Sequence, residues 1–307
     1  MKKNSANITL VVPAALGVSL DVLKSANAQT QPLEILVEEG KNPSANRNRG
    51  AARATTSLVG FTNAHTILSN NWVERVEEVF KRYPEIDILG GPQLNYPGDS
   101  YFARVNGDAL ASSFCTGKMS VRYRPGPFNL NADETSLTSA NLICRRSVFE
   151  KIRFDETIYP GEDPKFVTEA RNAGFRLAYA PGVIVFNRRR QNFFALGKQV
   201  FNYGWARVRK ESLAQLLKHP VFFAPTGIIL YLLSLPSVLI FGCFWLFPLW
   251  VYLFFAVLAA GKRAVECRRW GYFITLPFLF LWIHISYGMG FLLCFLRGGW
   301  QSRKIEI

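Results

Sequence analysis

Short apolar runs alternate with helix-like stretches along the first part of the chain. Residues 8–13, 33–38, 58–63 and 86–91 are nearly continuous in apolar side chains, many of them β-branched. Such runs are typical of strands that are buried on both faces of a sheet. Between them, residues 71–83 repeat apolar side chains at the spacing of an amphipathic helix. This alternation predicts βαβ units and therefore an α/β fold.

A less regular segment follows these elements. Residues 95–133 are rich in Gly, Pro and Asn, so we expect mostly loop around one short helix there. Regular structure resumes at residues 137–144, and residues 164–173 have a helical pattern. Apolar runs at 177–179 and 183–186 predict two further short strands. We expect these elements to complete one large domain over residues 1–215.

The first apolar run has two interpretations. Lys2 and Lys3 precede it and Ala26-Asn27-Ala28 follows it, which resembles a secretory signal with a small-residue cleavage site. Pro13 interrupts the run, however, whereas the apolar centre of such a signal is expected to be unbroken. The pattern therefore favours a buried first strand.

The last third of the chain changes character. Residues 221–261 contain no charged side chain, and residues 272–296 contain only His284 as an ionisable group. A helix needs about 20 apolar residues to cross a bilayer, so the first stretch is long enough for a hairpin of two transmembrane helices. We therefore expect residues 216–307 to form a C-terminal membrane domain.

Charges between the apolar stretches predict the orientation. Lys262, Arg263, Arg268 and Arg269 lie there, and basic loops tend to stay on the cytoplasmic side of a membrane. The hairpin then leaves and re-enters the cytoplasm, and the N-terminal domain lies on that side too. We expect a multi-pass protein of the inner (cell) membrane. The stretch at 272–296 is compatible with a spanning helix and with a helix that lies along the interface.

The net charge of +14 narrows the choice of partner. Many basic side chains precede the apolar stretches, where they suit anionic lipid headgroups, and some of them suit a diphosphate. Beside a membrane segment they argue against nucleic acid as the partner. The five cysteines have no paired motif spacing, which predicts neither a zinc site nor a disulfide framework.

Polar residues follow the first three predicted strands. Ligands of open α/β sheets bind at the carboxyl ends of the strands, so the loops near Pro13, Glu38 and Asn63 should meet at one crevice. Glu38 and Glu39 can accept hydrogen bonds from a nucleobase or ribose, but a solvated strand end is the simpler interpretation. Asn63 and His65 share one side of an extended tripeptide, and imidazole is a common metal ligand. A lone histidine is more often a packed polar residue.

A second group of charged residues lies nearer the membrane segment. Gly161-Glu162-Asp163-Pro164 precedes a helical pattern that ends at Gly174. An N-cap Asp with Pro at the first helical position explains this pattern structurally. A carboxylate there can also act as general base toward an acceptor hydroxyl, so Glu162 and Asp163 can divide the two roles. The run Arg188-Arg189-Arg190 can bind phosphate or belong to a juxtamembrane basic belt.

Taken in order, these segments resemble a membrane-attached family-2 glycosyltransferase with the GT-A fold. The resemblance covers nearly the whole chain, and its short motifs occur in the expected order and spacing. The His-containing variant of its metal motif resembles enzymes of succinoglycan-type exopolysaccharide assembly. The motifs are Val11-Val12-Pro13, Val37-Glu38-Glu39-Gly40, Ala45-Asn46-Arg47-Asn48-Arg49-Gly50, Asn63-Ala64-His65, Gly161-Glu162-Asp163, Phe201-Asn202-Tyr203-Gly204 and residues 284–290.

The resemblance implies a Rossmann-like mixed sheet followed by transmembrane helices. It also implies an inverting, hexosyltransferase-like enzyme of cell-surface polysaccharide assembly. Such an enzyme moves a sugar from a nucleotide-diphosphate donor to a hydroxyl of a lipid-linked or polysaccharide acceptor. Asp163 is the implied base, with Glu162 beside it. The implied nucleotide-sugar-binding residues are Pro13, Ala15, Glu38, Glu39, Arg47, Asn63 and Arg190.

The implied metal site departs from the family pattern. The family has Asp where this chain has Asn63, which keeps an oxygen ligand but loses the negative charge. Mg²⁺ or Mn²⁺ then depends on His65, with a weaker contribution from Asn63. Two other functions therefore remain: a glycosyltransferase-like scaffold of a polysaccharide assembly complex that has lost catalysis, and a membrane nucleotidyltransferase that releases pyrophosphate.

Overall fold

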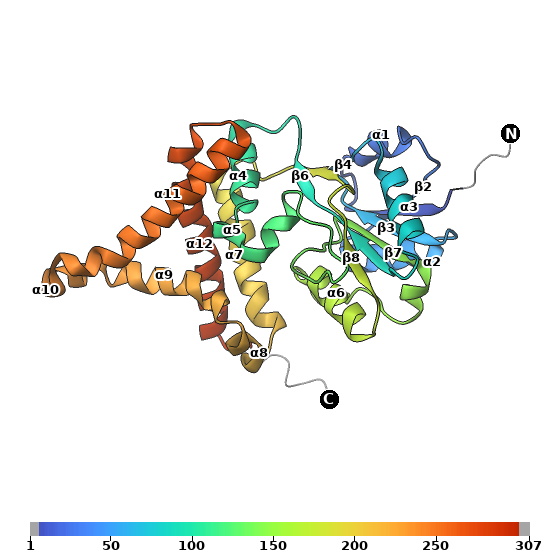
Figure 1. Ribbon diagram of the computed structural model, residues 1–307. Coiled ribbons are helices and arrows are strands. Elements are labelled where there is room, and N and C mark those ends of the chain that lie inside the picture. Colours follow the sequence, from blue (N-terminus) through green and yellow to red (C-terminus); the bar gives the residue numbers. More distant parts are fainter. Residues whose placement is uncertain (1–5, 301–307) are drawn as a thin grey trace. The chain divides into compact units, whose positions relative to one another are not determined.

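The computed structural model describes residues 6–300, which fold into two compact units (Figure 1). The sheet unit comprises the described residues up to Asp99 together with Lys118–Arg189. The helical unit comprises Ser100–Gly117 and the described residues from Arg190 onward. Ser100–Gly117 therefore lies between the two parts of the sheet unit in sequence but belongs to the helical unit. The functional division into residues 1–215 and 216–307 stays a prediction.

The sheet unit contains two sheets. Their strands are β1 Ile8–Ala14, β2 Glu34–Glu39, β3 Leu58–Thr62, β4 Thr66–Leu68, β5 Ile88–Gly90, β6 Gln93–Asn95, β7 Asn141–Arg145, β8 Leu177–Tyr179 and β9 Val185–Asn187. The larger sheet has the order β2-β1-β3-β7-β5-β8, and the smaller one has the order β4-β9-β6. β1 is parallel to β2 and β3, whereas β7 runs antiparallel between β3 and β5. The larger sheet is therefore mixed.

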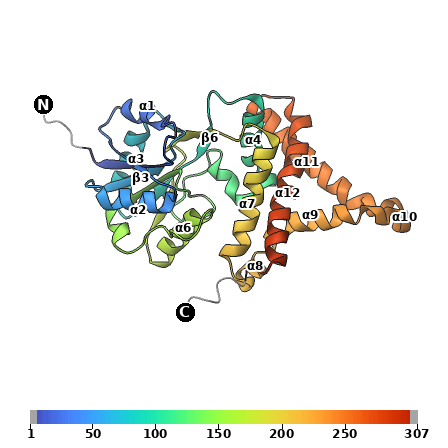
Figure 2. The same cartoon turned by 180° about the vertical axis from the view of Figure 1, so that it is seen from behind.

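Helices pack on both faces of the larger sheet, as the views from opposite sides show (Figures 1 and 2). They are α1 Val22–Asn27, α2 Pro43–Arg53, α3 Trp72–Arg82, the short 3₁₀ helix η2 Arg146–Glu150 and α6 Glu162–Asn172. Side chains alternate along β1, so Leu10 packs in a cluster with α1 and α3 while Val11 packs in one with α2 and α6. A Cβ at Gly50 of α2 would lie 2.3 Å from Cγ1 of Val11. Only glycine lets α2 lie this close to β1.

The predicted α/β alternation is confirmed, and most element ends differ by one or two residues. The segment predicted to begin at residue 137 forms β7, which begins only at Asn141, and β4 and β6 were not predicted. Residues 8–13 belong to β1, a strand inside the sheet, as the interrupted apolar run indicated. The expectation of mostly loop over residues 95–133 is wrong in part. That segment contains α4 Tyr101–Leu110, α5 Ser113–Thr116 and the 3₁₀ helix η1 Gly117–Arg122. Ser100 starts α4 by accepting a hydrogen bond from the backbone N–H of Ala103, a cap that overall composition does not reveal.

The helical unit is built around α12, which packs against α4, α7, α9 and α11. Its further helices are α7 Phe193–Lys210, α8 Leu213–Lys218, η3 Pro220–Phe223, α9 Ala224–Leu233, η4 Leu235–Ser237, α10 Val238–Phe241, η5 Gly242–Leu246, α11 Phe247–Cys267 and α12 Tyr272–Leu296. The chain reverses between α9 and α11 near α10 (Figure 1). Gly242 at this turn has φ +68°.

Two stretches of the described chain are long and apolar enough to cross a membrane, Leu235–Cys267 and Tyr272–Leu296. Pro220–Leu233 is apolar but shorter. Half of the most apolar part of Tyr272–Leu296 is buried inside the protein, whereas that of Leu235–Cys267 is not buried. The protein thus has two long apolar C-terminal helical segments, and the hairpin between residues 221 and 261 presents its apolar side chains outward.

Close backbone approach joins α7 to α12. A Cβ at Gly204 would lie 2.1 Å from the backbone oxygen of Tyr287, and one at Gly290 would lie 2.0 Å from that of Phe201. These distances are too short for any Cβ, so both positions require glycine. The sequence segments 201–204 and 284–290, which stood out as motifs, therefore hold two helices together.

A buried ion pair joins three further helices of the same unit. Asp108 of α4 accepts hydrogen bonds from Nη2 of Arg263 at 2.9 Å and from the hydroxyl of Tyr272 at 2.5 Å. Arg263 belongs to α11 and Tyr272 begins α12. Because a buried carboxylate is costly without partners, this arrangement fixes α4 against both helices.

We expect Gly290→Ala to lower the free energy of unfolding by about 2 kcal/mol, because the new Cβ overlaps a backbone oxygen that cannot move aside. Gly227→Ala in α9 is the matched control, since a Cβ there meets nothing within 4 Å. It should be neutral or stabilising by up to about 1 kcal/mol. Thermal unfolding of the full chain in detergent checks both variants. Equal melting temperatures would contradict the close packing of α7 on α12.

Candidate active site

The carboxyl ends of β1, β2 and β3 lie at one edge of the larger sheet. The register places Pro13 opposite Glu38 and Ala14 opposite Glu39. Ala15 is exposed and begins the loop after β1. Pro13, Ala15 and Glu39 therefore occupy neighbouring positions at this edge.

Glu38 and Glu39 have different surroundings. The carboxylate of Glu38 is 7% exposed and accepts hydrogen bonds from Arg53 at 2.6 Å and Arg49 at 3.3 Å. These bonds tie β2 to α2. Glu39 is exposed, as the alternation of side chains along a strand requires. Glu39 is thus the carboxylate of this pair that a solvent-borne ligand can reach.

The loop after β3 lies beside the loop after β1. The backbone oxygen of Ala64 accepts a hydrogen bond from Val22 at 3.1 Å, which holds the Asn63–His65 segment against the start of α1. His65 is 48% exposed, and its Nδ1 lies 3.9 Å from Oδ2 of Asp21. A hydrogen bond from Ser19 is the main cause of the lowered pKa of Asp21.

Arg188, which follows β9 near the end of the sheet unit, also lies beside Asp21 and His65. β9 pairs antiparallel with β4, and Thr66 lies opposite Asn187. The same register, continued by one residue, sets His65 opposite Arg188, and directly opposite side chains on neighbouring strands are close enough to interact. Nη2 of Arg188 lies 3.1 Å from Oδ2 of Asp21. The carboxylate of Asp21 thus faces both His65 and Arg188.

Tyr96 completes this group, which we call the Arg188 cluster: Asp21, His65, Tyr96 and Arg188. The guanidinium carbon of Arg188 lies 4.3 Å from the centre of the Tyr96 ring, and its Nη2 donates to the Tyr96 hydroxyl at 3.2 Å. Arg189 points the other way, is buried and donates to the backbone oxygen of Gln93. Within the run of three arginines, only the first joins this cluster.

A second group joins α2 to α6. Nη1 of Arg47 lies 3.0 Å from Oε1 of Glu162 and 3.9 Å from Oδ1 of Asp163. Burial, and next the charge of Asp163, raise the pKa of Glu162. The side chain of Glu162 is 7% exposed and that of Asp163 is 23% exposed. Oδ1 of Asp163 is buried and has no hydrogen-bond partner in the described part of the chain, so the exposed part of this side chain lies away from that oxygen. Asp163 is therefore the more accessible carboxylate of the pair.

The start of α6 differs from the expectation. Gly161 is the N-cap residue, with φ +121°, and no side chain caps the helix. Glu162 and Asp163 lie in the first turn, with Pro164 after them, so the prediction of an acidic N-cap is wrong. The left-handed φ of Gly161 moves the cap one residue earlier than an Asp cap would. Both carboxylates then sit where the helix dipole favours negative charge.

The surroundings of Asn63 and His65 do not fit a divalent cation. No three His, Cys, Asp or Glu side chains gather as possible ligands within residues 6–300. Asp21 is the carboxylate that faces His65, and Arg188 already pairs with it. A cation about 2 Å from that carboxylate oxygen would lie within about 5 Å of the guanidinium. Repulsion from the guanidinium then offsets part of the attraction of the cation to this carboxylate.

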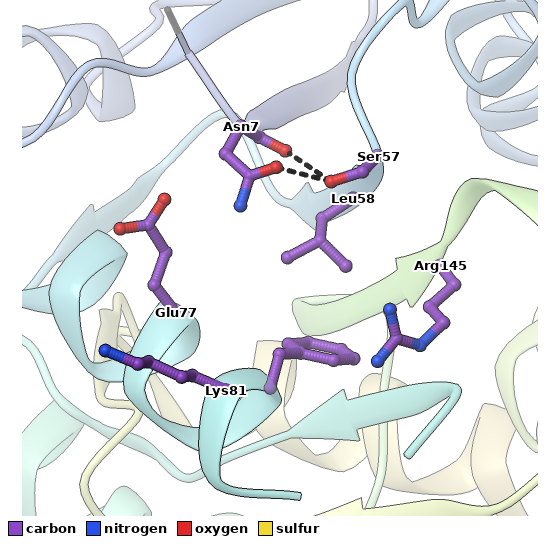
Figure 3. A pocket seen from close by; sticks show the side chains of 7 residues that line it. Asn7, Ser57, Leu58, Glu77, Lys81 and Arg145 are labelled. Carbon is purple, nitrogen blue, oxygen red and sulfur yellow. Dashed lines mark hydrogen bonds between the residues drawn. The ribbon is translucent and has the colours of Figure 1, made fainter. Parts of the chain in front are cut away.

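A hollow of about 380 Å³ lies away from these groups (Figure 3). It is found at the amino ends of β1 and β3, the edge opposite Glu39 and His65, and α3 and the end of β7 also contribute to it. Arg145 in its wall donates to the backbone oxygens of Ile86 at 2.8 Å and Pro84 at 2.7 Å. This hollow contains none of the predicted site residues.

Comparisons with known proteins agree with this arrangement. Residues 19–153 match the family described as Glycosyl transferase family 2. This stretch of the chain is similar to glycosyltransferase family 2. Two proteins described as "Pre-mycofactocin glycosyltransferase", from two strains of Mycobacterium tuberculosis, are 30% identical to the chain over 152 residues, which is 49% of this chain and 31% of theirs. The chain thus spans about a third of the length of these curated relatives.

A solved structure shares the fold over most of the chain. It is the mannosyltransferase PcManGT from Pyrobaculum calidifontis in complex with GDP-Man and Mn²⁺, with a TM-score of 0.52 and 13% identity. The alignment covers 96% of this chain and 88% of that one. The predicted fold, a GT-A-like mixed α/β sheet followed by long apolar helices, is therefore confirmed. The likeness to succinoglycan-type enzymes stays a prediction.

Sequence patterns did not single out two members of the Arg188 cluster. Asp21 belongs to none of the sequence motifs, and Tyr96 lies in the segment 95–133 that was expected to be mostly loop. Strand pairing is what would identify these two residues. β9 lies between β4 and β6, and Asn187 is opposite both Thr66 and Asn95. The residues that adjoin these strand ends must meet. Short three-residue strands give too little pattern to fix such pairing from sequence.

Glu162→Gln should change how stability depends on pH. The folded state raises the pKa of Glu162 above the ordinary value of 4.5, so the folded chain binds this proton more tightly than the unfolded chain. That contribution is present below the unfolded pKa and is lost as pH rises through the folded pKa. The stability of the variant minus that of the wild type should therefore increase from about pH 4 to about pH 7. Urea unfolding over this range measures the difference.

Glu169→Gln, at a more exposed position of α6, is the control. It should give a difference that does not rise with pH. A difference for Glu162→Gln that falls as pH rises would show that ionised Glu162 stabilises the fold.

Proposed function

We propose that the protein transfers a sugar, with inversion, from a nucleotide-diphosphate donor to a hydroxyl of a lipid-linked or polysaccharide acceptor. The match of residues 19–153 to glycosyltransferase family 2 supports the reaction class. The observation that carries the proposal is the accessible Asp163 carboxylate beside the buried pair of Arg47 and Glu162. A base in such a position can take a proton from an acceptor without losing its place in the fold.

The reaction is a single displacement at the anomeric carbon. The acceptor oxygen attacks that carbon and forms the new glycosidic bond, while the bond from the carbon to the phosphate oxygen breaks. The nucleoside diphosphate leaves with the bonding electron pair. The acceptor proton passes to the carboxylate of Asp163, a general-base step that typically contributes about 10²–10⁴-fold in rate. One displacement inverts the anomeric configuration.

The neighbouring residues have supporting roles in this proposal. Pro13, Ala15 and Glu39 border the nucleotide at the strand ends, where Glu39 accepts hydrogen bonds from ribose or base. Glu38 supports that edge through α2, because its carboxylate is held by two arginines. Arg47 orients Asp163 and Glu162, since its guanidinium is buried against both.

The apolar hairpin supports a membrane-bound acceptor. Near its turn, Leu239 is 89% exposed and Phe244 is 87% exposed, and residues 221–261 include no charge. Exposed apolar surface on this scale marks a contact with lipid or protein. The basic residues at 262, 263, 268 and 269 favour the cytoplasmic side for the adjoining loop. We propose an inner-membrane enzyme of cell-surface polysaccharide assembly with its sheet unit in the cytoplasm.

Asp163→Asn should reduce sugar transfer by about 10²–10⁴-fold and leave binding of the nucleoside diphosphate within about twofold, because the amide cannot accept the proton. Glu169→Gln on the same helix is the control and should keep full activity. Release of labelled nucleoside diphosphate from a panel of nucleotide sugars, with membrane extract as acceptor source, measures the rate.

Other outcomes of this assay separate the competing functions. Full transfer by Asp163→Asn rules out the base assignment. Release of pyrophosphate in place of nucleoside diphosphate identifies a nucleotidyltransferase. Neither transfer nor nucleotide binding in the wild type supports the scaffold.

Charges in the middle of an apolar helix of the hairpin should detach the protein from membranes. We expect the double variant Phe254→Asp with Phe255→Asp, at exposed positions of α11, to move from the carbonate-washed membrane pellet to the soluble or aggregated fraction, because each buried charge costs about 3 kcal/mol at the bilayer centre. Leu130→Asp, an exposed apolar position of the sheet unit, is the control and should leave the distribution unchanged. Retention of the double variant in the pellet would contradict insertion of the hairpin.

A further inference from the structure

We propose that Arg188 binds the donor diphosphate beside Asn63 and His65, in the place that a divalent cation takes in metal-dependent relatives of this fold. The inference rests on the proposed function, because it assigns a residue to the donor of that reaction. It starts from the geometry of the Arg188 cluster and from the poor fit of the same position to a metal ion.

Strand pairing puts Arg188 at the loop where the diphosphate is expected. The β4–β9 register sets it opposite His65, the last residue of the Asn63-Ala64-His65 segment. That segment follows β3 at the edge where the loops of three parallel strands meet. Asn187, the residue before Arg188, is paired with Thr66, so the backbone of Arg188 leaves the sheet next to His65.

Two contacts orient the guanidinium and leave donors available. Nη2 is engaged by Asp21 and by the hydroxyl of Tyr96. Nε and Nη1 have no hydrogen-bond partner among the residues that the structure describes, and the side chain is 47% exposed. Guanidinium N–H groups match phosphate oxygens well and stay charged at any physiological pH. The stack on Tyr96 keeps the flat face of the group covered, so the open N–H edge is the part that a ligand can reach.

The local charges explain why an arginine replaces the metal. Asn63 lacks the negative charge that a divalent cation needs from this loop. The carboxylate of Asp21, which faces His65, is already matched by the charge of Arg188. The pair is neutral without ligand, and a diphosphate that displaces Asp21 from the guanidinium gains the one positive charge of this side chain. When the glycosidic bond forms, the same guanidinium stabilises the charge that develops on the leaving diphosphate.

The test is a titration of the full chain in detergent with GDP, UDP, ADP and CDP by calorimetry, first in EDTA and then in MnCl₂. We expect the tightest of the four to bind in EDTA with an affinity within about threefold of that in Mn²⁺. Arg188→Met should weaken this binding at least about tenfold, the usual loss for a hydrogen-bonded charge pair. Arg188→Lys should recover part of it, because lysine keeps the charge but not the fork of donors.

Arg75→Met is the matched control. Arg75 is 48% exposed and pairs with Glu78 of its own helix at 2.7 Å, so it resembles Arg188 in exposure and pairing but lies on α3. Its removal should leave nucleotide affinity unchanged. The melting temperature of each variant without nucleotide shows that it is folded.

Asp21→Asn should change the affinity for nucleoside diphosphate in the opposite direction to Arg188→Met. It frees Arg188 from a competing carboxylate, so nucleoside diphosphate should bind in EDTA several-fold more tightly than to the wild type. If Asp21 were instead a metal ligand, the same variant would abolish an Mn²⁺-dependent component of binding. A merely structural role of the pair predicts weaker or equal binding together with a lower melting temperature.

The outcomes separate this inference from the proposed function. Binding that requires Mn²⁺, or that Arg188→Met leaves intact, overturns the role of Arg188 while the sugar-transfer proposal stands. No binding of any of the four nucleotides in either condition overturns the proposed function and this inference with it. Metal-independent binding that is lost in Arg188→Met and strengthened in Asp21→Asn supports both.

Discussion

Parallel pairing of β1 with β2 and β3 is the constraint on which the candidate site depends. It sets the ends of three strands side by side, so Pro13, Glu39 and the Asn63–His65 segment occupy one edge. The alternation of side chains along β1 supports this pairing, because Leu10 and Val11 anchor the strand in apolar clusters on opposite faces. A slip of one residue would exchange the two faces and move Val11 away from Gly50 of α2, where only glycine leaves room for it. The register is therefore strongly specified, and it fixes the positions of the residues at the strand ends.

Ion pairs give neighbouring residues of the same kind different roles in the structure. Glu38 and Glu39 are neighbours in sequence, but arginines of α2 hold the first while the second stays exposed. Glu162 and Asp163 divide in the same way around Arg47. Arg188 and Arg189 point in opposite directions, one toward Asp21 and the other toward the backbone of β6. In each pair one member supports the fold and the other remains accessible to a ligand.

The helical unit is stabilised by different interactions from those of the sheet unit. Its interior depends on glycines that allow backbone contact and on one buried group of Asp108, Arg263 and Tyr272. Its hairpin, in contrast, exposes apolar side chains near residues 239–247. Such a surface is stable when something other than water covers it. The unit therefore combines a well-packed base with a part whose apolar surface is suited to lipid.

The sequence by itself determined the α/β alternation, the apolar C-terminal segments and the family resemblance, because these depend on local periodicity and on motifs a few residues long. It did not determine the helices at residues 101–122, where a Ser100 cap outweighs a loop-like composition, or the glycine cap of α6. Only the tertiary structure showed that Glu38 is tied to α2 and that Asp21, Tyr96 and Arg188 meet at His65. Those contacts join residues that are far apart along the chain, through the three-residue strands β4, β6 and β9, and strands so short carry almost no pattern of their own.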